Sequence, residues 1–181
     1  MTKKALLVLA DGFEEIEAVV PIDLLRRAGI DLVTAGLKKE WVQGRQGVTL
    51  KADTVLNRVI GLFDALILPG GPGHKALMES DRVLRLTEDY FRDKILCCAI
   101  CAAPRVFAAA GILDGKRFTC YPGSLDDFGN GEYVPAEVVR DGNIITSAGP
   151  GTAVPFSLSI IEALLGEAKA AAVKAQILYH D

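Results

Sequence analysis

Short apolar runs alternate along the chain with longer segments in which apolar residues recur at helical spacing. The runs that predict buried strands are residues 6–10, 30–35, 65–68 and 95–100, with further strands expected near 118–120, 136–139 and 144–146. The segments that predict helices are residues 14–27, 76–78, 83–92, the stretch after Pro104, 153–165 and 167–176. This alternation favours an α/β fold with a mainly parallel sheet that helices cover on both faces.

Glycines refine this pattern at two places. Gly29 directly follows the helix predicted at 14–27 and is expected to cap its C-terminus. Residues 41–42 and 48–52 are expected to form a small hairpin, because glycines lie between them. No internal repeat or linker divides the chain, so we expect a single domain over residues 1–181.

The composition limits the classes of partner. Half of the 181 residues are hydrophobic, and a chain of this size buries roughly 70% of its unfolded surface without help from disulfides or metal. The net charge of −3, without a basic block, argues against a nucleic-acid partner. No apolar stretch approaches the length of a membrane span, and the run at 6–10 is too short for a signal peptide. We therefore expect a cytoplasmic protein without a membrane partner.

Cys101 is the leading candidate for chemistry. It follows the strand predicted at 95–100 and precedes Pro104, where a helix is expected to begin. A residue at such a junction lies on a sharp turn, with its side chain outside the sheet and backbone N–H groups pointing toward it. These surroundings favour the thiolate over the thiol. The pattern therefore predicts a reactive cysteine.

The other cysteines give weaker signals. Cys97 and Cys98 lie inside the predicted strand on opposite faces and are expected to pack in the core. Cys120 ends another predicted strand and has no base beside it in sequence, so the sequence does not decide between a structural and a chemical role for it. His74 and His180 are the only histidines, so the chain lacks the further ligands that a zinc site needs. We expect no metal site.

Glycine-rich loops follow several predicted strands and are expected to meet beside Cys101, because ligands bind beyond the carboxyl ends of parallel strands. These loops are residues 11–14, 69–73 and 147–152. None matches a dinucleotide or P-loop fingerprint, so no cofactor is expected. Their glycines suit a close approach of backbone N–H groups to a small ligand or an oxyanion, and equally suit ordinary turns.

Two acidic residues interrupt the apolar positions of the helix at 14–27. Glu17 has mainly apolar neighbours, and Pro21 lacks the N–H that would bond the Glu17 carbonyl. Burial would raise the pKa of this carboxyl and suit it to acid–base catalysis beside a thiol, but a structural role is equally open. Asp23 has Arg27 four residues later, and a helical ion pair explains these two residues.

Five motifs, in this order and at consistent spacing, resemble the ThiJ/PfpI superfamily, and in particular the branch of the Parkinson's-disease-associated protein deglycase and its bacterial relatives. The motifs are GFEEIE at 12–17, DLLRRAG at 23–29, LPGG at 68–71, AICAAP at 99–104 and TSAGPGT at 146–152. The resemblance runs nearly end to end. It implies a flavodoxin-like three-layer sandwich of the class I glutamine amidotransferase type, and a homodimer.

The resemblance also implies roles for individual residues. Cys101 matches the nucleophile and Glu17 its acidic neighbour, while Gly71 and Ala102 match residues whose backbone amides stabilise an oxyanion. Gly70 belongs to the same binding turn. An outer set of site residues would comprise Tyr121, Asp23, Arg27, Gly149 and Pro150.

The chain departs from the family pattern at several positions. Protease-like branches have a histidine directly after the cysteine, where this chain has Ala102, so peptidase activity is not expected. Animal deglycases have a histidine where this chain has Tyr121, and a phenol is not a base near neutral pH. Gln46, preceded by Arg45, stands where the family often has Arg or His. His74 lies in the loop after Gly71, from which it could approach the site, and we expect it to be an exposed loop residue.

Two functions fit these residues. The first is a cofactor-independent enzyme, a hydro-lyase or hydrolase of the glyoxalase III or deglycase kind, that acts on small α-oxoaldehydes or their adducts. Cys101 would attack the reactive carbonyl and Glu17 would move a proton between adjacent carbons. The second is a redox-sensing or stress-protective module, in which Cys101 is oxidised to sulfenic or sulfinic acid without turnover.

Overall fold

The computed structural model describes residues 2–124, 126 and 128–180 and confirms the flavodoxin-like α/β fold. Its main sheet has seven strands in the order β10-β11-β7-β6-β1-β2-β5. The strands are β1 (Lys4–Leu9), β2 (Asp31–Gly36), β5 (Thr54–Val55), β6 (Ala65–Leu68), β7 (Leu96–Ile100), β10 (Val138–Asp141) and β11 (Ile144–Ser147). Their pairing is parallel except between β10 and β11, so the carboxyl ends of the central strands meet at one edge.

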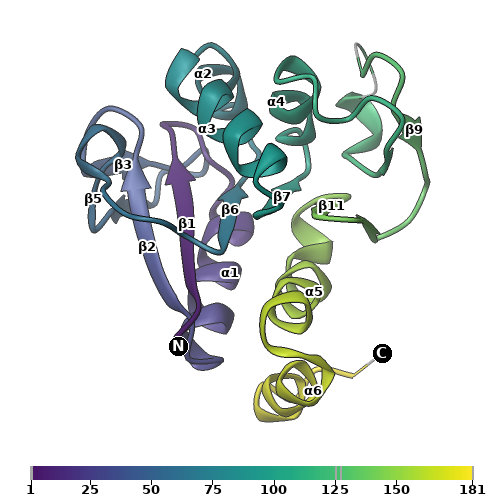
Figure 1. Cartoon of the computed structure of the whole chain (residues 1–181). Coiled ribbons are helices and arrows are strands. Elements are labelled where there is room, and N and C mark those ends of the chain that lie inside the picture. The colour runs from purple at the N-terminus through teal and green to yellow at the C-terminus, as the bar shows by residue number, and fades with distance from the viewer. Residues whose placement is uncertain (1, 125, 127, 181) are drawn as a thin grey trace.

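Helices cover both faces of this sheet (Figure 1). They are α1 (Glu15–Arg27), α2 (His74–Met78), α3 (Asp81–Arg92), α4 (Pro104–Ala109), α5 (Ala153–Leu165) and α6 (Glu167–Gln176). Residues of α1, α5 and α6 pack in one apolar core, and residues of α2, α3 and α4 pack in another. The predicted three-layer arrangement is therefore present.

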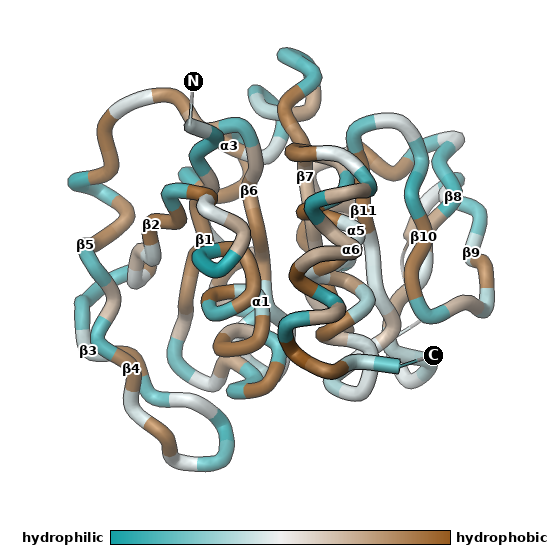
Figure 2. Tube along the Cα trace, turned by 90° about the horizontal axis from the view of Figure 1, so that it is seen from below, coloured by the Kyte–Doolittle hydropathy of each residue, from teal (hydrophilic) through white to brown (hydrophobic). Residues whose placement is uncertain are grey.

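Strand β1 shows why two cores form. Leu7 and Leu9 face the core beneath α1, whereas Leu6 and Val8 face the opposite core, because successive side chains of a strand alternate between faces. Both faces are covered, so the strand is continuously apolar rather than alternating. Figure 2 shows the same concentration of apolar residues along the central strands, with hydrophilic residues common on the surrounding loops.

Of the smaller predicted features, the hairpin and the helix end are present, and one strand is shorter than expected. The hairpin forms as expected from β3 (Trp41–Gln43) and β4 (Thr49–Lys51), which pair antiparallel. The strand expected near 118–120 is only β8 (Arg117–Phe118), which pairs with β9 (Glu132–Tyr133) outside the main sheet, so Cys120 lies beyond a strand. At the end of α1, Gly29 has a φ of 84° and closes the helix as predicted.

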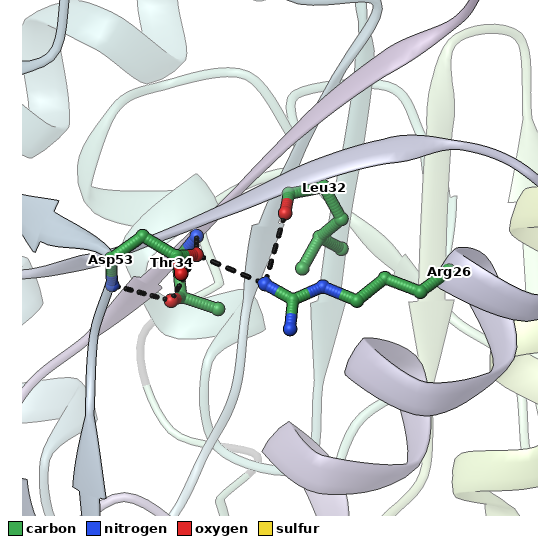
Figure 3. Close-up of polar contacts among 4 residues, drawn as sticks. All are labelled: Arg26, Leu32, Thr34 and Asp53. Atoms are coloured by element: carbon green, nitrogen blue, oxygen red, sulfur yellow. Dashed lines mark hydrogen bonds and ion pairs between the residues drawn. The ribbon is translucent and has the colours of Figure 1, made fainter.

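A polar cluster ties α1 to the β2–β5 edge of the sheet (Figure 3). Asp53 Oδ2 accepts hydrogen bonds from the backbone N–H of Thr34 at 2.8 Å and from its hydroxyl at 2.7 Å. Arg26 Nη2 lies 3.0 Å from the same oxygen and also donates to the Leu32 carbonyl at 3.2 Å. The Asp53 carboxylate therefore accepts hydrogen bonds from both α1 and β2 at the edge of the sheet.

We predict that Asp53→Ala lowers the free energy of unfolding by about 1–3 kcal/mol, because it leaves the N–H of buried Thr34 without its acceptor. The matched control is Asp31→Ala, whose carboxylate is 3.9 Å from the Lys4 ammonium on the surface. Such an exposed pair contributes less than about 1 kcal/mol. Urea unfolding measures both variants, and equal losses would contradict this account of the cluster.

Candidate active site

Cys101 occupies the turn between β7 and α4 and has a φ of 63°, a left-handed conformation that L-residues rarely adopt. Its N–H donates to the Ser147 carbonyl at 2.9 Å, and its carbonyl accepts from the Tyr121 N–H at 2.9 Å. These bonds hold a conformation that costs about 1–3 kcal/mol. The sharp turn inferred from the sequence is therefore present, and two neighbouring segments fix it.

The Glu17 carboxyl lies beside this turn and is fully buried. Its Oε2 accepts a hydrogen bond from the Gly70 N–H at 2.8 Å. Its Oε1 is buried without a partner of normal hydrogen-bond geometry among the described residues, although the Cys101 thiol interacts with the carboxyl. A Cβ atom on Gly70 would lie 2.7 Å from Glu17 Oε2 and 2.8 Å from Cys101 Cβ, so only glycine fits there. The carboxyl and the cysteine share one small space.

Burial changes the acidity of Glu17. Loss of solvation raises the pKa of this carboxyl from 4.5 to about 7, against the opposing effect of hydrogen bonds from Cys101 and from the Gly70 N–H. The charge of Glu14 adds to the increase. The sequence-based expectation that burial raises the pKa of Glu17 is confirmed. Near neutral pH this carboxyl can therefore both hold and release a proton.

The expectation that the turn favours a thiolate is wrong for the resting site. Burial raises the pKa of Cys101 to about 12, and the negative charge of Glu17 contributes further. The N–H groups of Gly71 and Ala102 approach the sulfur and lower its pKa, as the turn geometry implies, but by less. No sequence pattern indicates that the same carboxyl proposed as a partner would oppose ionisation of the thiol. Cys101 is therefore a thiol beside a base.

The loops after β1 and β6 meet as the sequence predicted. Gly71 has a φ of 76°, and a Cβ atom there would lie 2.5 Å from the Gly12 carbonyl oxygen and 2.6 Å from the Glu14 nitrogen. The Gly70 carbonyl accepts from the Glu14 N–H at 3.1 Å. The diglycine turn is therefore packed between the start of α1 and the cysteine.

Two further charged groups near the site were not identified as site residues from the sequence. Arg45 Nη1, from the hairpin, lies 3.5 Å from Glu14 Oε2, and its charge reaches Glu17. Glu15 Oε1 accepts from the Gln46 N–H at 2.7 Å and so attaches the tip of the hairpin to α1. Because the hairpin lies far along the chain, no local pattern reveals this contact.

The outer set of residues divides into two groups. Asp23 and Arg27 form the expected ion pair at 2.8 Å on the exposed surface of α1, which accounts for both without a contact to Cys101. Tyr121 is half exposed, and its ring lies 3.4 Å from where a Cβ atom of Gly149 would be. Pro150 follows in a short 3₁₀ helix (Pro150–Thr152). Tyr121 and Gly149 thus lie together beside the segment that holds the Cys101 turn.

His74 corrects another expectation. It is buried rather than exposed, with 8% of its surface accessible, and it forms the first residue of α2. Its Nδ1 lies 2.8 Å from the Gly71 carbonyl oxygen. Cys97 and Cys98 are buried in opposite cores as expected, and Cys120 is also buried.

Two further properties of the described residues concern metal binding and membrane-spanning helices. Among the residues that the structure describes, no three His, Cys, Asp or Glu side chains gather in an arrangement that would hold a metal ion. None of the helices in the described part of the chain combines the length and the apolar character that crossing a membrane requires.

The fold is a mainly parallel α/β sandwich. Its candidate site combines a cysteine on a strained strand–helix turn, known as a nucleophile elbow, with a buried carboxyl, and these features define the class of protein. The chain belongs to the DJ-1/PfpI family, whose model matches residues 3–163. The family expected from the motifs is thereby confirmed.

Individual relatives are similar over most of their length. Parkinson disease protein 7 homolog of Danio rerio is 43% identical over 99% of this chain and 98% of its own. A Pyrococcus abyssi protein named a deglycase is 34% identical over 82% of this chain and 91% of its own. The crystal structure of Drosophila melanogaster DJ-1beta superimposes with a TM-score of 0.96, at 42% identity and over the full length of both chains.

The raised pKa of Glu17 predicts a specific dependence of stability on pH. The folded state binds this proton more tightly than the unfolded state, so the resulting stabilisation is present below pH 4.5 and is lost as the pH rises through about 7. Relative to Glu17→Gln, which stays neutral, the wild-type protein should lose about 3 kcal/mol of unfolding free energy between these limits. Urea unfolding of both proteins at pH 4.5 and 8 measures this difference. A difference that does not change with pH would contradict the assignment.

Proposed function

We propose that this protein is a cofactor-independent enzyme that converts small α-oxoaldehydes, or their early adducts, into hydroxy acids. The observation that carries the proposal is the contact between Cys101 on its strained turn and the buried carboxyl of Glu17. A nucleophile, an acid–base group and backbone donors lie within one site, which is the minimum set for an aldehyde-to-acid rearrangement. A relative named a deglycase supports the same reaction class.

In the first step the sulfur of Cys101 attacks the aldehyde carbon of methylglyoxal. Because the thiol is not ionised at rest, Glu17 acts as a general base and takes its proton as the carbon–sulfur bond forms. The N–H groups of Gly71 and Ala102 stabilise the negative oxygen. The proton then passes from Glu17 to that oxygen, which gives a neutral hemithioacetal.

The second step moves hydrogen between adjacent carbons. Glu17 removes the proton from the hemithioacetal carbon to give an enediolate and returns that proton to the neighbouring carbon, while the hydroxyl proton of the first carbon moves to the oxygen of the second. The aldehyde carbon is thereby oxidised and the ketone carbon reduced, so no external oxidant is needed. The product is a thioester of lactate on Cys101. Water hydrolyses that thioester, which releases lactate and restores the thiol.

The sequence departures are compatible with this mechanism. Ala102 supplies only a backbone N–H after the cysteine, so the site has no adjacent histidine for peptide hydrolysis. The Tyr121 backbone N–H donates to the Cys101 carbonyl, and its ring is half exposed at the surface. Glu17 therefore serves as the base without a histidine from that position.

We predict that purified protein produces lactate from methylglyoxal and that Glu17→Gln reduces turnover at least about 100-fold, because it removes the general base. Cys101→Ser should abolish turnover, whereas Cys97→Ala, which removes a buried thiol elsewhere, should retain it. Turnover of the wild type should rise with pH through about 7, as Glu17 ionises. Lactate formation that persists in Cys101→Ser, or is absent from folded, reduced wild type, would refute the proposed enzyme.

One observation favours a second function, that of a redox-sensing or stress-protective module. Glu17 Oε1 is buried without a conventional partner, so the protonated carboxyl has a hydrogen to donate to an oxygen of the oxidised Cys101 side chain. Absence of turnover together with selective oxidation of Cys101 by peroxide would support this function. Oxidation of Cys101 no faster than that of Cys97 would argue against it.

We also propose that the protein forms a homodimer through a patch made of Ile16 and Val19 of α1 and Val48 of the hairpin. Ile16 and Val48 are each 50% exposed and Val19 is 42% exposed. The two elements are adjacent, because Glu15 Oε1 accepts a hydrogen bond from the Val48 N–H at 3.3 Å. Exposed apolar side chains gathered on one face are typical of interfaces between copies of a chain.

We predict that Ile16→Asp shifts the protein from dimer to monomer at micromolar concentration, because the charge would be buried in the interface. The control is Ile60→Asp, which introduces the same change at a residue that is 93% exposed outside the patch. Sedimentation velocity measures both. A monomeric wild type, or a dimer that survives Ile16→Asp, would contradict the proposed interface.

A further inference from the structure

His74 is a buried titratable side chain that the proposed reaction does not use. It lies at the start of α2 with 8% of its surface accessible, and burial lowers its pKa, so it is neutral at physiological pH. Its Nδ1 lies 2.8 Å from the Gly71 carbonyl oxygen. A carbonyl oxygen is only an acceptor, so Nδ1 carries the hydrogen and donates it.

The diglycine turn has little rigidity of its own and depends on its partners. The Gly70 N–H donates to Glu17 at 2.8 Å, and the Gly70 carbonyl accepts from the Glu14 N–H at 3.1 Å. The Gly71 carbonyl accepts from His74 twice, from the backbone N–H at 3.1 Å and from the ring. The remaining polar group of the turn is the Gly71 N–H, which approaches the Cys101 sulfur.

Of these bonds, only two come from side chains. Glu17 accepts from the N–H of the first glycine, and the His74 ring donates to the carbonyl of the second. The Gly71 N–H lies in the peptide plane that it shares with the Gly70 carbonyl, whereas the Gly71 carbonyl lies in the next plane, and the two planes join at the Gly71 Cα. Gly71 has a φ of 76°, and glycine rotates about this Cα at little cost, so a bond that holds the carbonyl plane restricts how far the N–H plane can turn. The His74 ring is the side chain in position to do this.

We propose that His74 is a positioning residue: its ring holds the Gly71 carbonyl and so limits rotation about the Gly71 Cα, which keeps the N–H of the preceding peptide pointed at the Cys101 sulfur. The consequence for the thiol follows from the geometry alone, and only the consequence for turnover rests on the proposed function. Without the ring donor, the Gly71 N–H would spend less time directed at the sulfur. The thiol would then lose part of the stabilisation of its ionised form.

Two substitutions distinguish the role of Nδ1 from that of Nε2. Asparagine places its Nδ2 at the same distance along the side chain as Nδ1 of histidine, so His74→Asn can keep the bond to Gly71. Glutamine is one carbon longer and places its amide nearer to the position of Nε2, so His74→Gln cannot keep the bond in the same geometry. His74→Leu fills similar space without any donor.

The experiment is the rate of Cys101 alkylation by iodoacetamide as a function of pH, followed by mass spectrometry of the intact protein. Loss of one hydrogen bond predicts that His74→Leu and His74→Gln react about fivefold more slowly near neutral pH. His74→Asn should stay within about twofold of wild type. Thermal melting confirms that each variant is folded.

The outcomes are distinct from those of the turnover experiment, because alkylation reports on the thiol whether or not the protein makes lactate. Equal slowing in the Asn, Gln and Leu variants would show that His74 only fills space, and would overturn the proposal. Wild-type alkylation rates in folded His74→Leu would overturn it as well. If turnover exists, the positioning role also predicts a lower kcat with little change in KM for His74→Leu and a recovery of kcat in His74→Asn.

Discussion

The site depends on one constraint, which is that the Glu17 carboxyl is removed from water and held by the Gly70 N–H beside the Cys101 sulfur. Desolvation moves the pKa of this carboxyl to about 7 and that of the thiol to about 12. The usual picture of a cysteine nucleophile that is ionised at rest therefore does not apply. In the proposed reaction the Cys101 thiol gives its proton to Glu17 as the carbon–sulfur bond forms.

The fold provides this constraint through parallel strands and glycines. The carboxyl ends of β1, β6 and β7 lie next to one another, so the loops that follow them meet without a long excursion. The diglycine turn then fits where any Cβ atom at Gly70 would strike the carboxyl and the cysteine. Glycine is required at this point for space, whereas at Gly71 it is also required for a positive φ. The packing that excludes water from Glu17 is the same packing that forces the chain to use glycine.

The fold and the centre of the site could largely be predicted from the sequence, because both follow from local patterns. Apolar runs indicated the central strands, and Cys101 was identified by its place between a strand and a proline-initiated helix. Contacts between distant segments could not be predicted in this way, so the burial of His74 and the attachment of Glu14 to Arg45 were missed. The acidity of Cys101 was predicted wrongly for a related reason, because the balance between backbone donors and burial depends on three-dimensional packing.

The most direct test of the central claim is the infrared carbonyl stretch of a protonated carboxyl, recorded for the wild type and Glu17→Gln between pH 5 and 9. At pH 6 ordinary carboxyl groups are ionised. We expect that one protonated carboxyl persists in the wild type, disappears as the pH rises through about 7, and is absent from Glu17→Gln. A wild-type spectrum without that band at pH 6 would show that Glu17 is ionised in the resting protein and would contradict the account.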